Sequence, residues 1–320
     1  MINPEKVRVV FMGTSAFAEQ ILASLIEANY NLIAVYTQPD KKVGRTQELR
    51  KSAVKITAEK NNITVFEPNK FDESTVNKLA ELNPDVVIVA AYGKILPENV
   101  LKIPPHGTIN VHASLLPKYR GASPIQNVLL NGEEKTGITI MLLDKGVDTG
   151  EIISQAEIDI DPNDTAENLT EKLATLGSEL LIKTLPSYMD GKIELKKQDD
   201  SLATLCRLIK REDGLIDWND TAENIYNKFR AFQPWPGIYT FWENNNSPKR
   251  IKLVKINLET CPPLAGKYQI GEIFKSEDKI AVQTGAGLII LEELQMEGKT
   301  SVSTKNFLNG YQNFIKSILK

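Results

Sequence analysis

The sequence predicts an α/β protein with a doubly wound, Rossmann-like domain of mainly parallel sheet, followed by a small OB-like β-barrel domain. One observation predicts the first domain. Short β-branched runs alternate with amphipathic helical segments over residues 7–143, and this alternation favours parallel strands joined by right-handed crossovers. A second observation predicts the barrel: after residue 206, short apolar runs are separated by Gly, Asn and Pro turns, as in small barrels. We expect domains at 1–190 and 207–320, with a charged linker at 191–206.

Hydrophobic periodicity predicts the elements of the first domain in chain order. Strands are expected at 7–12, 32–37, 63–66, 85–90, 108–112 and 137–143, and helices at 17–28, 54–60 and 73–82. Residues 151–160 alternate polar and apolar side chains, which indicates an edge or antiparallel strand, and a long amphipathic helix is expected over 164–188. Ligands of such sheets bind beyond the carboxyl ends of the strands. The candidate loops therefore follow residues 12, 90, 112 and 143.

The second domain is expected to open with a helix at 221–232. Five short strands are then predicted, at 238–243, 250–257, 271–274, 279–284 and 287–294. Basic residues at 249–255 indicate either a binding face or lysines that protect a sheet edge. We interpret Trp235, which lies between two prolines, as a packing anchor rather than a base-stacking platform.

Composition limits the class of protein. The chain has 320 residues, of which 42% are hydrophobic, and its net charge of −3 argues against a general polyanion binder. Cys206 and Cys261 belong to no metal-binding or redox motif. The N-terminus lacks a signal-peptide pattern, and the longest apolar run, residues 86–92, is too short to span a bilayer. We expect a cytoplasmic protein and a monomer.

One short stretch predicts the chemistry. Asn110 and His112 are two positions apart on a predicted strand, so their side chains share one face. Asp148 follows the next strand in a turn-forming segment. The amide can hold a developing oxyanion, the imidazole can move protons near neutral pH, and the carboxylate can fix the imidazole's tautomer. These residues predict an enzyme of acyl transfer, whereas we interpret His106 as structural.

A nicotinamide-dependent oxidoreductase is disfavoured. Gly13 follows the first predicted strand, but the sequence continues Thr14-Ser15-Ala16 without the second and third glycines of the dinucleotide fingerprint. We interpret Gly13 as a tight turn, either for ligand approach or for plain turn geometry.

Several motifs together resemble a known family. The strings NVHASLLP at 110–117, YRG at 119–121 and DTG at 148–150 are similar to the signature of the 10-formyltetrahydrofolate-dependent formyltransferases. The similarity continues at 37–45, 120–126, 230–236 and 294–310, so it covers almost the full length.

The resemblance implies a reaction and a site. It implies transfer of the formyl group of 10-formyltetrahydrofolate to the free amino group of initiator methionyl-tRNA, for translation initiation, with no metal. Asn110, His112 and Asp148 match the family's catalytic residues. The folate-contacting positions that it implies are Ser114, Leu115, Leu116 and Pro117, with Tyr92 and Gly93 beside the pteridine ring.

The loop at 38–55 matches the family's tRNA-reading insertion in length. It departs from the pattern by Thr46-Gln47-Glu48 and by the absence of two prolines. Its basic residues can still contact phosphates of the acceptor end; those expected to bind tRNA are Lys41, Lys42, Arg45, Arg50 and Lys51, with Lys55 also basic. Without the resemblance, a flexible solvated loop is the preferred interpretation.

Three alternatives stay open. An amino-sugar-nucleotide N-formyltransferase would share the catalytic residues but has no use for a long basic loop. A glycinamide ribonucleotide formyltransferase would need only one domain. A tRNA-binding protein without chemistry is disfavoured by the intact Asn110, His112 and Asp148 set.

Overall fold

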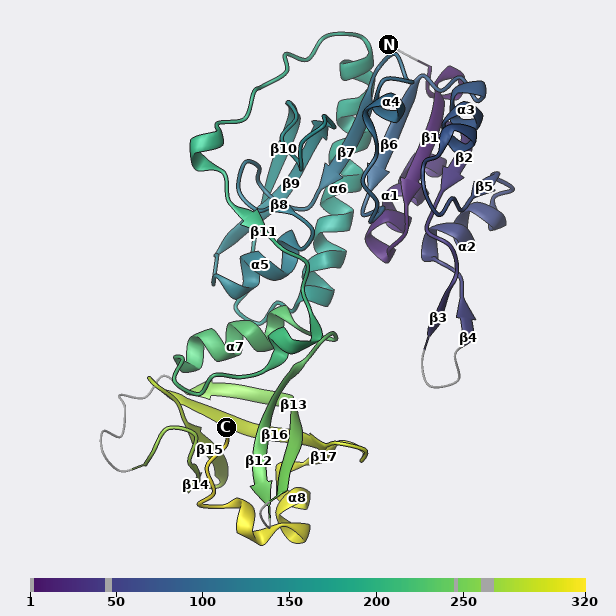
Figure 1. Ribbon diagram of the computed structural model, residues 1–320. Helices are drawn as coiled ribbons and strands as arrows, with labels where there is room; N and C mark the ends of the chain where they lie inside the picture. The colour runs from purple at the N-terminus through teal and green to yellow at the C-terminus, as the bar shows by residue number, and fades with distance from the viewer. Residues whose placement is uncertain (1–2, 44–47, 245–246, 260–267) are drawn as a thin grey trace. The chain divides into compact units, whose positions relative to one another are not determined.

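The computed structural model describes residues 3–43, 48–244, 247–259 and 268–320, which form two compact units (Figure 1). The first unit comprises Met1–Pro124, Lys135–Ile160 and Leu169–Arg207, and the second comprises Ile125–Glu134, Asp161–Asn168 and Leu208–Lys320. The chain therefore passes between the units more than once.

A seven-stranded sheet forms the first unit, in the order β10-β9-β7-β6-β1-β2-β5. Its strands are β1 (Arg8–Gly13), β2 (Asn31–Tyr36), β5 (Val65–Phe66), β6 (Val86–Ala90), β7 (Thr108–His112), β9 (Lys135–Leu142) and β10 (Ile152–Asp159). The neighbours from β5 to β7 pair in parallel, which confirms the Rossmann-like fold class. The alternation of residues 151–160 also predicted correctly that β10 is antiparallel to its neighbour.

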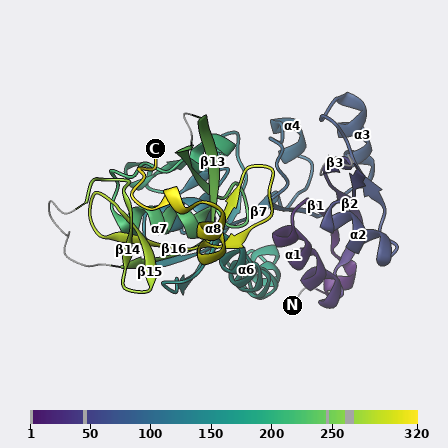
Figure 2. The same cartoon turned by 90° about the horizontal axis from the view of Figure 1, so that it is seen from below.

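Helices cover both faces of this sheet (Figure 2). They are η1 (Pro4–Lys6), α1 (Ala16–Glu27), α2 (Ala53–Lys60), α3 (Glu73–Glu81), α4 (Glu98–Leu101) and α6 (Ala166–Met189). On the α3 and α4 face, Val10, Met12, Val87 and Val89 form one apolar cluster with Leu79 and Val100. On the opposite face α6 lies so close that a Cβ at Gly177 would sit 3.1 Å from Val111 Cγ1. Gly13 allows a similar approach, since a Cβ there would lie 2.6 Å from Ala18 Cβ of α1.

Strand β9 departs from the expected parallel arrangement. It pairs antiparallel with β7, with Ile109 opposite Leu142 and His112 opposite Thr139. The end of β9 therefore lies beside the start of β7, not beyond its carboxyl end. The expectation that the loop after residue 143 leaves from the ligand-binding edge was wrong, because β9 runs antiparallel to β7 and therefore ends at the opposite edge of the sheet.

Two further features of the first unit are short strand pairs. Strands β3 (Lys41–Val43) and β4 (Glu48–Arg50) form a hairpin that projects from the rest of the unit in Figure 1. Residues 196–206, called the strap here, run from a bridge between Ile152 and Lys196, through η2 (Asp200–Leu202), to β11 (Leu205–Cys206). Strand β11 pairs in parallel with β8 (Arg120–Gly121).

A curled antiparallel sheet dominates the second unit, in the order β12-β13-β16-β15-β14, with β17 on β16. The strands are β12 (Ile238–Asn244), β13 (Ser247–Glu259), β14 (Ile273–Ser276), β15 (Lys279–Gln283), β16 (Leu288–Met296) and β17 (Val302–Ser303). The helices are α5 (Pro124–Leu130), η3 (Arg211–Gly214), α7 (Ala222–Ala231), α8 (Thr304–Gly310) and η4 (Gln312–Phe314). This arrangement confirms the small barrel-like second domain.

Tryptophans in the second unit occupy opposite environments. Trp242 is fully buried, with its ring 5.1 Å from that of Phe314 and 6.1 Å from that of Phe307. Trp235 has 58% of its surface exposed, so its interpretation as a packing anchor was wrong. The alternation of β12 places Trp242 inside, whereas Trp235 lies in the Pro-rich turn before that strand.

Among the described residues, no helix combines the length and the apolar character that crossing a bilayer requires.

Candidate active site

Asn110 and His112 lie on one face of β7, as their spacing predicts. Their partners across the strand pair are Met141 and Thr139 of β9, and neighbouring Val89 of β6 pairs with Asn110. The two polar side chains thus continue the face that α3 and α4 cover with apolar residues. His112 is buried, and Asn110 is half-buried.

Asp148 reaches both residues from the loop after β9. Its Oδ2 lies 3.6 Å from His112 Nδ1, and its Oδ1 accepts a long hydrogen bond of 3.4 Å from Asn110 Nδ2. The backbone N–H of Gly121 donates to Oδ2 at 2.9 Å. The loop after β9 therefore folds over the sheet face and brings the Asp148 carboxylate to the Asn110 amide and the His112 imidazole. It does so although it starts from the edge of the sheet opposite to the one expected.

The ring of His112 is oriented by a backbone carbonyl. Its Nε2 lies 3.0 Å from the carbonyl oxygen of Tyr119, and a carbonyl only accepts, so Nε2 carries a proton. This leaves Nδ1 as the nitrogen that faces Asp148. At 3.6 Å the pair is too long for a hydrogen bond, so Nδ1 is free to interact with a substrate atom.

The segment expected to contact the folate is fixed by a buried threonine. Thr139 Oγ1 donates to the Ser114 carbonyl at 2.7 Å and accepts from the Leu116 N–H at 3.1 Å. Gln155 Nε2 donates to the Leu116 carbonyl at 2.9 Å. Ser114 Oγ is itself engaged with the Lys118 carbonyl at 2.7 Å. Leu115 and Pro117 are half-buried and Leu116 is buried, so the segment offers backbone groups and apolar edges.

Three loops meet at the carboxyl ends of β1, β2 and β6. The Tyr92 carbonyl accepts from Thr14 Oγ1 at 3.0 Å and from Gln38 Nε2 at 2.9 Å, and Gln38 Nε2 also lies 3.2 Å from the Gly93 carbonyl. The Tyr92 side chain belongs to the sheet core, where burial raises its pKa. At this position the exposed Gly93, with φ of 76°, is the accessible part.

The hairpin gathers the basic residues expected to contact tRNA. Lys41 pairs directly with Arg50, and both are exposed; like charges at opposed positions repel each other. Burial lowers the pKa of nearby Lys94, and the charge of Lys41 lowers it further. Exposed Lys42 lies next along the hairpin, Lys51 forms an ion pair with Glu59 at 2.7 Å, and Arg45 lies outside the described residues.

Lys55 has a different environment from the other basic residues of this loop. Its ammonium lies 3.0 Å from Asp40 and 2.8 Å from Glu67, and only 12% of its side chain is exposed. Hydrogen bonding to Glu67 raises its pKa. Because Asp40 precedes β3 and Lys55 lies in α2, the ion pair joins the two ends of the hairpin segment and does not present a free cation.

Sequence reasoning missed the polar contacts of the strap. Arg120 is buried, and its Nε and Nη2 donate to Gln198 Oε1 at 3.0 and 2.8 Å. Gln198 Nε2 donates to the carbonyls of Asp148 and Gly150 at 2.9 and 2.8 Å. A Cβ at Gly121 would lie 2.2 Å from the Cys206 carbonyl. The only sequence signal was Arg120 beside Gly121 in the motif YRG.

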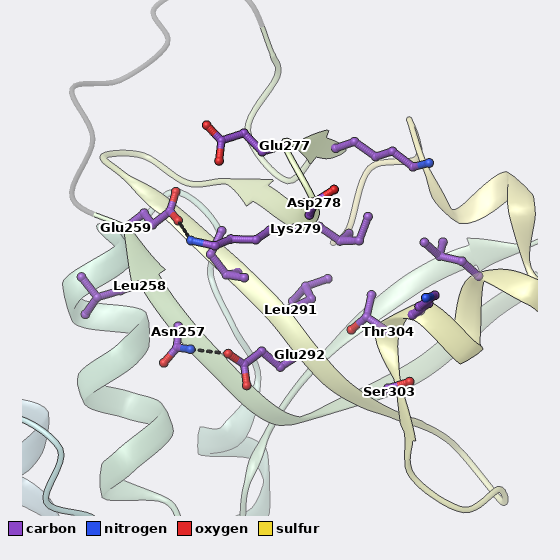
Figure 3. A pocket seen from close by; sticks show the side chains of 15 residues that line it. Asn257, Leu258, Glu259, Glu277, Asp278, Lys279, Leu291, Glu292, Ser303 and Thr304 are labelled. Carbon is purple, nitrogen blue, oxygen red and sulfur yellow. Dashed lines mark hydrogen bonds and ion pairs between the residues drawn. The ribbon is translucent and has the colours of Figure 1, made fainter.

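A hollow of about 840 Å³ lies in the second unit (Figure 3). Two contacts join residues of its lining: Lys279 pairs with Glu259, and the Asn257 amide donates a hydrogen bond to Glu292. The described residues hold no group of three or more His, Cys, Asp or Glu side chains suited to a metal ion.

Comparisons with known proteins identify the family. The formyl transferase family matches residues 5–185, and the formyl transferase C-terminal domain matches residues 208–312. The methionyl-tRNA formyltransferase of Caldanaerobacter subterraneus subsp. tengcongensis is 43% identical over 315 residues, covering 98% of this chain and all of the relative. That of Caldicellulosiruptor saccharolyticus is 45% identical over 308 residues, covering 95% and 97% of the two chains.

A solved structure shares the fold at lower identity. The N-formyltransferase from Helicobacter canadensis, in complex with folinic acid and dTDP-3-aminofucose, aligns with a TM-score of 0.66 at 22% identity, covering 89% of this chain and 98% of that one. The two family matches and the relatives confirm the resemblance inferred from the motifs. The chain belongs to the formyl transferase family and is an enzyme of that family.

Proposed function

We propose that this enzyme transfers the formyl group of 10-formyltetrahydrofolate to the free amino group of initiator methionyl-tRNA, acting as a cytoplasmic monomer. The convergence of Asn110 and His112 on Asp148 carries the proposal. The full-length relatives named methionyl-tRNA formyltransferase support the acceptor. We assign the transfer chemistry to residues 1–190 and the tRNA contacts to the hairpin and to residues 207–320, with 191–206 as the linker.

The residues of the site fit an activated formyl group. The folate donor supplies a formyl carbon bonded to a nitrogen that can leave. Asn110 Nδ2 donates a hydrogen bond to the formyl oxygen as the amine attacks and the oxygen gains charge. Such a donor typically contributes about 10²–10³ in rate. Its present bond to Asp148 is long, at 3.4 Å, so little is lost when it turns to the substrate.

His112 and Asp148 move the proton. The attacking amine forms the new C–N bond and must lose one proton, while the leaving nitrogen of the folate must gain one. Asp148 accepts the proton from the amine, directly or through a water, and passes it to Nδ1 of His112, which delivers it to the leaving nitrogen as the C–N bond to the folate breaks. The Gly121 N–H at 2.9 Å holds the carboxylate in place during this exchange.

Binding of the two substrates is assigned to the loops around this centre. Ser114, Leu115, Leu116 and Pro117, with Tyr92 and Gly93, would contact the folate through backbone groups and apolar edges. Gln38 supports both substrates, since it bonds the carbonyls of Tyr92 and Gly93 and lies just before the hairpin. Lys41 and Arg50 are two positive charges at paired positions of the hairpin. A tRNA phosphate bound between them would relieve their repulsion.

Catalytic substitutions test the proposal. His112→Ala and Asp148→Asn should each lower kcat of formyl transfer by about 10²-fold or more, while KM for methionyl-tRNA changes little. A matched control is His106→Ala. This second histidine precedes β7, and its hydrogen bonds to Tyr188 and Asp85 use backbone atoms that the substitution keeps. Formylation of methionyl-tRNA by either catalytic variant at the wild-type rate would contradict the assignment.

A further inference from the structure

Gln198, in the strap, makes four hydrogen bonds that join two segments of the site. Its Nε2 donates to the carbonyl oxygens of Asp148 and Gly150, at 2.9 and 2.8 Å. Its Oε1 accepts from Nε and Nη2 of Arg120, at 3.0 and 2.8 Å. Carbonyls only accept and a guanidinium only donates, so this orientation of the amide is the one that satisfies all four bonds.

The two segments that Gln198 joins are those that meet at the Asp148 carboxylate. Arg120 precedes Gly121, whose N–H donates to Asp148 Oδ2 at 2.9 Å. Gln198 holds the backbone of the same aspartate from the other side. Asp148 lies at a turn, with φ of 53°, a left-handed conformation in which Asp and Asn are enriched among non-glycine residues. Gln198 binds the carbonyls on this turn from outside its own segment.

The neighbouring contacts of the strap hold the same region. The Thr204 carbonyl accepts from the Arg120 N–H at 2.9 Å, and Thr204 Oγ1 accepts from the Tyr119 N–H at 2.8 Å. The Tyr119 carbonyl in turn receives Nε2 of His112 at 3.0 Å. The strap therefore supports the partners of both the carboxylate and the imidazole.

We propose that Gln198 is a positioning residue for formyl transfer, acting through Asp148. It fixes the aspartate's backbone against Arg120, so that the carboxylate faces His112 Nδ1 and Asn110 Nδ2. This inference rests on the proposed function, and it assigns a role in the reaction to a segment outside the recognised motifs. Displacement of a reacting group by about 1 Å costs about 10²-fold in rate, which sets the size of the expected effect.

Steady-state formylation of methionyl-tRNA by Gln198→Leu tests the role. We expect kcat to fall by about 10- to 100-fold, with KM for both substrates little changed. Gln198→Glu keeps the acceptor for Arg120 but loses both donors and turns a carboxylate toward two carbonyls, so it should lose kcat similarly. The matched control is Glu194→Gln, which makes the reverse of the Gln-to-Glu substitution at an exposed position just before the strap.

A double-mutant cycle with Asp148→Asn separates positioning from general damage. If Gln198 acts through the Asp148 carboxylate, Gln198→Leu should lower kcat much less in the Asp148→Asn background than in the wild type. Equal fold-losses in the two backgrounds, or wild-type kcat in both Gln198 variants, would overturn the inference. The wild-type enzyme run in parallel tests the proposed function itself, because its failure to formylate would be independent of Gln198.

Discussion

At the scale of single residues, the site depends on buried polar atoms whose partners are specific. Thr139 is fully buried, yet its hydroxyl donates to the Ser114 carbonyl and accepts from the Leu116 N–H. Thr136, on the same strand, is also buried, but its hydroxyl has no hydrogen-bond partner within the described residues. The threonine hydroxyl therefore orders a neighbouring segment at position 139, whereas the described residues give it no hydrogen bond at position 136.

Thr139→Val should weaken folate binding. The substitution removes the atom that orders the Ser114–Pro117 backbone and leaves two buried groups unpaired, which costs about 1–3 kcal/mol each in stability. We expect KM for 10-formyltetrahydrofolate to rise more than kcat falls, as measured by steady-state kinetics at saturating tRNA. Thr136→Val is the control and should leave both parameters unchanged. An unchanged folate KM in a folded Thr139→Val variant would argue against the assigned folate segment.

Cys206 offers a second residue-scale prediction. Its thiol is buried, donates to the carbonyls of Tyr119 and Arg120, and has its pKa raised by burial. Less thiolate is present at pH 8 than in an exposed cysteine, and the thiolate is the reactive form. Alkylation of the Cys206 peptide by iodoacetamide, followed by mass spectrometry, should be much slower in the folded protein than in urea. Equal rates would show that the strap does not stay closed over β8.

At the scale of elements, the hairpin is held at its base by the ion pairs of Lys55. Asp40 and Glu67 contact it from the segment before β3 and from the residue after β5. The pKa of Lys55 is raised above 10.5 by the Glu67 hydrogen bond. A group with a raised folded pKa contributes stability that is complete below its unfolded pKa and is lost as pH rises through the folded value. This contribution is therefore present at neutral pH and disappears above about pH 10.5.

Lys55→Met should loosen the base of the hairpin and leave Asp40 and Glu67 without their cation. Because the hairpin is assigned to tRNA, KM for methionyl-tRNA should rise several-fold while KM for the folate stays constant. Lys60→Met, an exposed lysine at the end of the same helix, controls for loss of charge. If Lys55→Met used tRNA as efficiently as the wild type, the ion pairs would not position the hairpin.

Sequence patterns predicted some of these elements and not others, for physical reasons. Alternation and helical spacing reflect buried apolar faces, so strands β1, β2, β5, β6 and β7 and the antiparallel β10 were predicted. The described side chains of the hairpin of β3 and β4 are all exposed, and its strands were not predicted. The direction of β9 was not, because residues 137–143 are apolar whichever way the strand runs. Asn110, His112 and Asp148 were recognisable from the motif, whereas Gln198 binds through polar atoms in a charged segment without periodicity. The interpretation of Trp235 as a packing anchor was wrong because its exposure depends on the surrounding turn and not on its being a tryptophan.

At the scale of the whole molecule, a chain of net charge −3 has to bind a polyanion under the proposed function. Local clustering of charge makes this feasible. Lys41 and Arg50 face each other with Lys94 near Lys41, whereas many other cations, such as Lys135 with Glu157 and Lys192 with Asp190, are paired. Attraction by a local basic cluster falls with salt as counterions are released from the nucleic acid.

The salt dependence of kcat/KM for methionyl-tRNA measures that cluster. Replacing Lys41 and Arg50 together by Gln should make the slope of log kcat/KM against log salt shallower by about 0.7–0.9 for each lost phosphate contact. The double variant Lys135→Gln and Lys192→Gln carries the same change in net charge and should retain the wild-type slope. If the two double variants changed the slope from the wild-type value by the same amount, net charge and not the hairpin would attract the tRNA.

The acceptor of the reaction can be determined by following labelled formyl from 10-formyltetrahydrofolate. Initiator methionyl-tRNA, elongator methionyl-tRNA and a dTDP-linked amino sugar would be offered to the wild-type enzyme in parallel. We expect rapid formylation of the initiator, little of the elongator and none of the sugar nucleotide. Transfer to the sugar nucleotide and not to tRNA would contradict this expectation, leaving the Asn110, His112 and Asp148 chemistry but removing the role assigned to the hairpin and the second domain.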